Sequence, residues 1–183
     1  RREPPGVSDA ILMSSRDGLN FQRWSNAFIR PSTEPEVWTD RNNYPAWGII
    51  ETSPEELSIY WTEHYRHPGM RLRRGVIRKD GFVSLQSAGQ VGEALTRLLR
   101  FEGSALEVNY ATDATGWIRF ELCKPDGTAI PGFTLYDSET LFGNELEHTV
   151  VWRGGSLAKL AEQEVRIRIR MENADLYSLR FVN

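Results

Sequence analysis

Charged and apolar residues alternate strictly in Glu164-Val-Arg-Ile-Arg-Ile-Arg-Met171, near the end of this 183-residue chain. A period of two places one set of side chains on a core and the other in water, as in a half-buried antiparallel strand. Similar short runs occupy residues 105–110, 117–123 and 175–181. Several such strands at close spacing, separated by Gly- and Asp-containing turns, predict an all-β protein with a jelly-roll-like β-sandwich over residues 86–183.

The preceding part of the chain, residues 1–85, has a different composition and carries most of the Trp and Pro residues. Short antiparallel strands are expected there at 10–14, 21–24, 47–51, 57–64 and 70–78. Lys79-Asp-Gly81 is expected to close a hairpin onto residues 82–85, and residues 87–92 are the linker candidate. One short helix is expected at residues 156–161, with Ser156 as its N-cap.

Composition excludes several classes of partner. The chain is 40% hydrophobic and 26% charged, with a formal net charge of −3. This charge gives no long-range attraction to nucleic acid or to an anionic membrane, and no apolar run is long enough to span a bilayer. The single cysteine, Cys123, excludes an internal disulfide framework and a multi-cysteine zinc site. We therefore expect no nucleic acid, membrane, metal or cofactor, and the compartment stays open, with a secreted or periplasmic location among the alternatives.

Two motifs in the first part point to a family. In Ser14-Ser-Arg-Asp-Gly-Leu-Asn-Phe21, Asp17 can accept backbone N–H groups, Gly18 accepts positive φ, and Phe21 is expected to anchor the next strand. The motif resembles a hairpin of the propeller blades of glycoside hydrolases such as families 32 and 43. Residues 59–64, 70–74 and 77–85 follow in an order that looks like the last blade of a five-bladed propeller of this kind.

The likeness continues through residues 116–122, 126–133, 151–155 and 174–181, which are similar to the C-terminal sandwich attached to such propellers. The resemblance implies that the chain is the non-catalytic C-terminal part of a glycoside hydrolase, with the catalytic carboxylates on earlier blades. No position here matches those carboxylates, so none receives a catalytic role. It also implies the upstream propeller portion of the same protein as a partner, with carbohydrate contact and self-association as further expectations.

Two segments, residues 41–47 and 60–67, combine aromatic rings with amide, carboxylate and guanidinium groups. A sugar needs both, because its apolar face stacks on a ring while its hydroxyls require polar partners. The residues expected to bind a ligand are Asn43, Tyr44, Trp47, Glu63, His64 and Trp117. The alternative for Trp47 and Trp61 is that they fill the space between stacked blades.

Other readings of these residues remain open. Glu51 and Glu63 form the likeliest local carboxylate pair, although carboxylates at strand ends are usually solvated. His64 and His67 are three residues apart, so on a strand they point to opposite faces, which argues against a metal site.

A lone blade cannot bury both faces, so Trp24, Trp47, Ile49, Ile59 and Trp61 are expected to pack on the sandwich, on a second copy or on each other. The alternative function is a stand-alone carbohydrate-binding or protein-interaction module.

Overall fold

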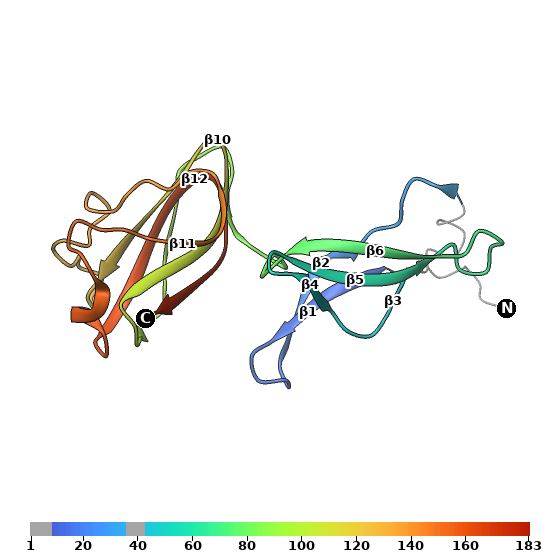
Figure 1. The fold of residues 1–183 in the computed structure, drawn as a ribbon, viewed down its shortest axis with the longest axis horizontal. Coiled ribbons are helices and arrows are strands. Elements are labelled where there is room, and N and C mark those ends of the chain that lie inside the picture. The colour runs from blue at the N-terminus through green and yellow to red at the C-terminus, as the bar shows by residue number, and fades with distance from the viewer. Residues whose placement is uncertain (1–8, 36–42) are drawn as a thin grey trace. The chain divides into compact units, whose positions relative to one another are not determined.

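The computed structural model describes residues 9–35 and 43–183, and its sheets are antiparallel, as the alternating pattern predicts (Figure 1). The chain divides into two compact units, unit 1 (Arg1–Lys79) and unit 2 (Asp80–Asn183). Among the described residues, no helix is long and apolar enough to cross a membrane. The all-β fold class is therefore confirmed.

The boundary between the two units falls between Lys79 and Asp80, whereas the sequence predicts it between residues 85 and 86. Strand β7 (Leu85–Ser87) pairs with β12 (Glu164–Val182) of unit 2, so the expected hairpin between 70–78 and 82–85 is wrong. Residues 87–92 are not a linker, because they connect β7 to β8 (Gly92–Leu95), which also pairs with β12. Pairing with a strand almost a hundred residues away in sequence overrides the local turn signal.

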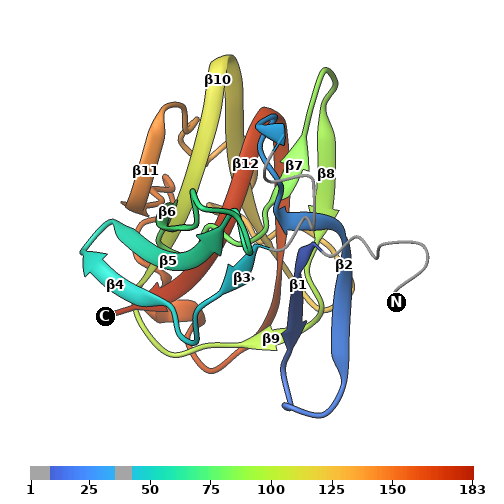
Figure 2. The same ribbon diagram turned by 90° about the vertical axis from the view of Figure 1, so that its right-hand side faces the viewer.

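Unit 2 is built around two very long strands, β10 (Ala105–Cys123) and β12, of 19 residues each. The sheet order is β11 (Asn144–Thr149), β10, β12, β7, with β8 and β9 (Leu99–Arg100) also on β12, and Figure 2 shows β11, β10 and β12 side by side. Each long strand joins two of the strands expected from the sequence. A register shift between Thr112 and Trp117 interrupts their pairing, and the sheet curls around the core (Figure 1).

The core of unit 2 confirms the alternation in the Glu164 run. Val165, Ile167, Ile169 and Met171 are buried, whereas the charged residues between them are at least partly exposed. These four side chains pack with apolar residues of β10 and of the following loops, including Phe120, Phe133 and Trp152. The expected helix is a single turn of 3-10 helix, Leu157–Leu160, and the hydroxyl of its N-cap Ser156 accepts a hydrogen bond from the N–H of Ala158.

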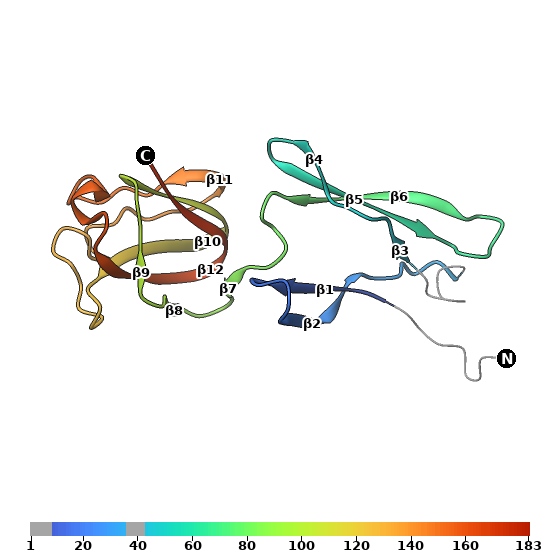
Figure 3. The same cartoon turned by 90° about the horizontal axis from the view of Figure 1, so that it is seen from below.

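Unit 1 contains a hairpin, β1 (Ala10–Ser15) with β2 (Phe21–Ile29), and a four-stranded sheet. In that sheet β3 (Tyr44–Pro45) and β4 (Ile50–Ser53) pair along one edge of β5 (Glu56–Glu63). Strand β6 (Arg71–Arg78) pairs along the other edge of β5, and Figure 3 shows β5 and β6 side by side.

The turn of the hairpin forms as the sequence predicts. Oδ1 of Asp17 accepts the backbone N–H groups of Leu19 at 2.9 Å and Asn20 at 2.8 Å, and Gly18 has a φ of 73°. These hydrogen bonds lower the pKa of Asp17, the bonds to Asn20 most strongly. Phe21 is exposed, so its expected anchoring role is wrong.

Unit 1 has little core of its own. Among its described residues, the buried hydrophobic side chains are Ile29 and Ile59. Trp47 and Ile49 are exposed in the single chain, so they do not pack on each other, and packing on a second copy stays a prediction. Ile59 is buried, as expected. The large apolar cluster belongs entirely to unit 2.

Candidate functional site

Glu63, at the end of β5, is the centre of the charged cluster of unit 1. Its carboxylate accepts hydrogen bonds from the Nε atoms of Arg71 at 3.1 Å and Arg73 at 2.7 Å, and from Nε1 of Trp61 at 3.2 Å. Burial alone raises the pKa of Glu63, but the hydrogen bonds from Arg73, Arg71 and Trp61 outweigh it and lower the pKa below 4.5. Glu63 is therefore an ionised carboxylate that fixes two guanidinium groups.

Trp61 lies beside this cluster because its strand partners leave room for the ring. The sheet register places Ile59 opposite Gly75 and Trp61 opposite Arg73, on one face of the sheet. A Cβ atom on Gly75 would come within 2.5 Å of the Trp61 ring. The absence of a side chain at Gly75 thus lets the indole cross the neighbouring strand, and the hydrogen bond to Glu63 fixes its orientation.

The structure places His64 in the same cluster. It is buried, has a φ of 55°, and Nε2 lies 2.9 Å from Oε2 of Glu34, close enough for an ion pair when the imidazole is protonated. The terminal nitrogen of Arg71 donates to both oxygens of the same Glu34 carboxylate, at 3.0 Å to Oε1 and 2.9 Å to Oε2. The left-handed backbone of His64 ends β5 and turns the chain toward β6.

The other residues expected in unit 1 lie in different surroundings. Asn43 is buried next to the start of β3, and its Oδ1 has no hydrogen-bond partner in the described parts of the chain. Tyr44 pairs with Thr62 on the opposite face from Glu63, and its ring meets Tyr65 edge-on with centroids 4.9 Å apart. Trp47, on the loop between β3 and β4, is fully exposed, at 102% of its reference area. The structure therefore joins Glu63 and His64, and separates them from Tyr44 and Trp47.

Trp117 belongs to unit 2, where it is partly buried beside the bend of β10. Its Nε1 donates to Oε2 of Glu172, its partner on β12, at 3.1 Å. Trp117 therefore braces the bend and is less open than the exposed stacking residue expected from the sequence.

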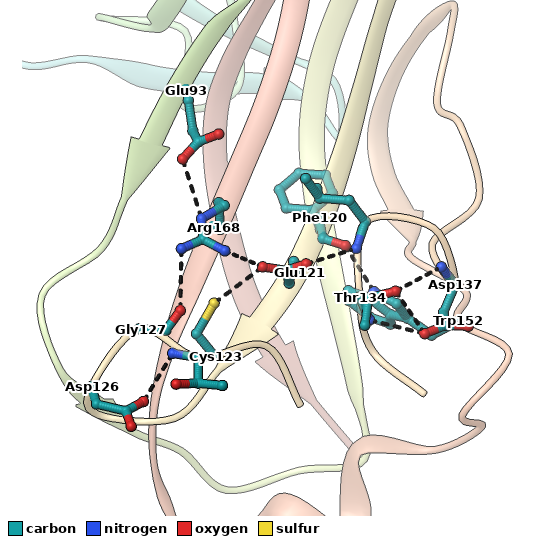
Figure 4. A network of polar contacts seen from close by, with 12 residues as sticks. Glu93, Phe120, Glu121, Cys123, Asp126, Gly127, Thr134, Asp137, Trp152 and Arg168 are labelled. Carbon is teal, nitrogen blue, oxygen red and sulfur yellow. Dashed lines mark hydrogen bonds and ion pairs between the residues drawn. The ribbon is translucent and has the colours of Figure 1, made fainter. Parts of the chain in front are cut away.

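A buried ionic network in unit 2 was not expected from the sequence (Figure 4). Glu121 is 5% exposed and forms an ion pair with Arg168, which lies directly opposite on β12. Its second oxygen accepts the backbone N–H of Leu135 at 3.0 Å. Arg168 also lies 3.2 Å from Oε1 of Glu93 and donates to the carbonyl of Gly127 at 3.1 Å. The network therefore ties the loop after β10 to β12 and β8.

Cys123 lies at the edge of this network and is fully buried. Its thiol donates to Oε1 of Glu121 at 3.4 Å, and burial together with this bond raises the pKa of Cys123 to about 11. A thiol that stays protonated at neutral pH is unreactive, so its role is structural in the folded chain.

The loop held by Glu121 presents an exposed aromatic ring that sequence reasoning also missed. Tyr136 is 75% exposed, and the guanidinium carbon of Arg153 lies 4.7 Å from its ring centroid. Phe133, three residues earlier, is fully buried, although both aromatic residues occupy the same irregular loop. The sequence has no periodicity there that could separate the inward ring from the outward one.

The described residues contain no group of three or more His, Cys, Asp or Glu side chains arranged to hold a metal ion. Comparisons with known proteins give no match to a family model, to a curated protein or to a solved structure.

Proposed function

We propose that this chain is a non-catalytic part of a carbohydrate-active protein, in which unit 1 serves as a blade-like segment that packs on the upstream part of a propeller. Unit 2 is the accessory β-sandwich in this proposal, and sugar contact comes from the exposed aromatic residues. The basis is the resemblance of the sequence motifs to glycoside hydrolases together with the surface of unit 1.

The observation that carries the proposal is the open apolar face of the unit 1 sheet. In the register of the sheet, Tyr44 and Leu72 flank Thr62, and Ile50 and Val76 flank Ser58, so all four point to one side. All four are exposed. An exposed apolar patch of this kind on a sheet with almost no buried core is typical of a surface that packs against another element.

Glu51 and Glu63, the carboxylate pair considered for catalysis, both have basic partners, which supports the non-catalytic part of the proposal. Glu63 is held by Arg71 and Arg73, and Glu51 lies 3.4 Å from Nζ of Lys79. A general acid of a glycoside hydrolase needs a raised pKa, whereas the pKa of Glu63 is lowered. Glu63 therefore lacks the environment that acid catalysis requires.

Trp47 is the best candidate in unit 1 for sugar contact. Its indole is fully exposed on a loop in which Gly48 has a φ of 97°, and none of its area is used for packing. Both faces of the ring are open to the apolar side of a pyranose.

Affinity electrophoresis in gels containing xylan, mannan or β-glucan tests the sugar contact. The full chain is expected to be retarded by at least one of the polysaccharides, and Trp47→Ala is expected to reduce the retardation without lowering the melting temperature. A matched control is Ile49→Ala, which removes an exposed apolar side chain from the same loop. Equal mobility with and without every polysaccharide would contradict carbohydrate contact, and turnover of aryl glycosides that Glu63→Gln abolishes would contradict the non-catalytic role.

A protein-interaction module is the second candidate, and the same apolar face favours it. At the middle of this face Nε of Arg74 donates to the hydroxyl of Ser58 at 2.8 Å, and its terminal nitrogen donates to Thr52 at 3.2 Å. An arginine fixed among exposed aliphatic and aromatic residues is typical of protein interfaces. Sedimentation of the wild type and of Leu72→Asp tests whether this face binds a second copy of the chain. Self-association through the face would be lost in the variant.

A further inference from the structure

Unit 2 presents Tyr136 in a setting that differs from an ordinary exposed aromatic residue. Most of its ring is in water, while the guanidinium of Arg153 covers part of it at cation–π distance. Phe142, 73% exposed on the same loop, provides a comparison within the same unit. Tyr136 does not contribute to the packing of the core, so its position next to Arg153 suggests another role.

The backbone on both sides of Tyr136 is held by hydrogen bonds. The N–H groups of Asp137 and Ser138 both donate to the carbonyl of Thr134 at 3.0 Å, which closes a tight turn around Tyr136. One residue earlier, the N–H of Leu135 donates to the buried carboxylate of Glu121. The ring is therefore carried by a turn that is anchored to the ionic network of unit 2. Figure 4 shows Thr134 and Asp137 of this turn beside Glu121.

Arg153 is placed by the neighbouring segment of backbone. Its N–H donates to the carbonyl of Asp137 at 3.0 Å, and the adjacent Trp152 forms a β-bridge with Ser138. Because Trp152 and Ser138 point into the core, their neighbours Arg153 and Asp137 point outward. Ring and guanidinium thus come from two segments whose relative position is fixed by main-chain bonds.

A carboxylate completes the group. Asp137 accepts the hydroxyl of Thr134 at 2.8 Å and its N–H at 3.2 Å, and these bonds hold the pKa of Asp137 below its usual value. The charge of Arg153 lowers the same pKa further. At neutral pH the surface therefore offers an aromatic ring and an anion on one turn, and a cation on the segment that is bridged to it.

We propose that Tyr136, Arg153 and Asp137 form a stacking subsite for a pyranose residue of a neutral glycan. The C–H face of the sugar stacks on the ring, while its hydroxyls accept from the guanidinium and donate to the carboxylate. A neutral sugar fits better than an acidic one, because the ionised carboxylate of Asp137 repels a second anion. The inference rests on the proposed function, since it names a second place where the chain contacts carbohydrate.

Titration of the isotope-labelled full chain with xylohexaose, cellohexaose and mannohexaose, followed by NMR, tests the subsite. We expect at least one glycan to shift the ring resonances of Tyr136 and the side-chain N–H of Arg153, with a Kd on the order of 1 mM. Tyr136→Ala is expected to weaken this binding about tenfold, whereas Tyr136→Phe, which keeps the ring, changes it less than about twofold. The control Phe142→Ala leaves it unchanged.

The outcomes separate this inference from the proposed function. Shifts at Trp47 with none at Tyr136 would overturn the subsite and leave the proposed function standing. Glycan-induced shifts of the other loop resonances that persist in Tyr136→Ala would overturn the role of the ring. If none of the three glycans shifts either residue, both the subsite and the carbohydrate contact are refuted.

Discussion

Replacing Glu121 by Ala should strongly destabilise unit 2. The carboxylate is buried, pairs with Arg168 across the strands and accepts the N–H of Leu135. Glu121→Ala leaves the partly buried guanidinium of Arg168 with fewer acceptors and the backbone N–H of Leu135 without its acceptor. Both losses act on the folded state, because in the unfolded chain water satisfies all these groups.

The magnitude follows from the surroundings of Arg168. Removing one member of a buried ion pair costs about 3–5 kcal/mol. Arg168 keeps Glu93 and the carbonyl of Gly127 as partners, so we expect the lower end, about 3 kcal/mol in the free energy of unfolding. For a unit of this size such a loss lowers the melting temperature by at least about 12 °C.

Cys123 supplies an assay that reports on unit 2 alone. It is the single cysteine of the chain and is fully buried with a raised pKa, so it reacts with a thiol reagent only when unit 2 opens. Pulse labelling across a urea titration gives the unfolding midpoint, and the slope of the transition shows whether the compactness of either state has changed.

Glu107→Ala is the matched control. Glu107 is also on β10 and pairs with Arg180 at 2.8 Å, but Arg180 is largely exposed and has Glu147 as a second partner. Surface pairs of this kind contribute about 0–1 kcal/mol. A cost below about 1 kcal/mol for Glu121→Ala, or an equal fall of the midpoint in the two variants, would contradict this contribution of the buried ion pair.

Three further predictions concern unit 1. Gly75→Ala places a Cβ against the Trp61 ring and should cost about 1–3 kcal/mol, whereas exposed Val76→Ala should cost less; hydrogen exchange of the β5 and β6 amides measures both. The lowered pKa of Glu63 means that its contribution is present above pH 4.5 and lost as the pH falls below it; thermal unfolding of unit 1 should show this loss in the wild type and a smaller one in Glu63→Gln. Asp17→Ala removes the acceptor of the β1–β2 turn and should speed exchange of the Leu19 and Asn20 amides, whereas Arg16→Ala should leave it unchanged.

The fold class could be predicted from the sequence because alternation is a local property. The charged and apolar positions from Glu164 to Met171 define the two faces of β12 without knowledge of its partners. The same holds for the Asp17 turn, whose hydrogen bonds all lie within a few residues. The hairpin expected after Lys79 was wrong because β7 pairs with β12, and no local pattern encodes so distant a partner.

The polar clusters depend on register and could not be derived in the same way. Glu121 and Arg168 both occupy strand positions that the alternation assigns to water, and only their opposition across β10 and β12, covered by the loop of Leu135, makes a buried pair. Glu63 and His64 were singled out as neighbours in the sequence, whereas Glu34 joins them from a distant loop. Tyr136 and Phe133 could not be distinguished, because an irregular loop has no period.

Native-state hydrogen exchange of the full chain tests the proposed role of unit 1. The exchange is measured separately for the amides of β5 and β6 and for those of β10 and β12. Unit 1 buries Ile29 and Ile59 among its described hydrophobic residues and leaves one sheet face open, whereas unit 2 has a continuous core. We predict that the β5 and β6 amides exchange at least about 100-fold faster than those of β10 and β12, because unit 1 buries few hydrophobic side chains and, in the proposed function, packs on a partner surface. Equal protection of the two sets in the monomeric chain would show that unit 1 is complete on its own and would contradict the proposal that it is one part of a propeller.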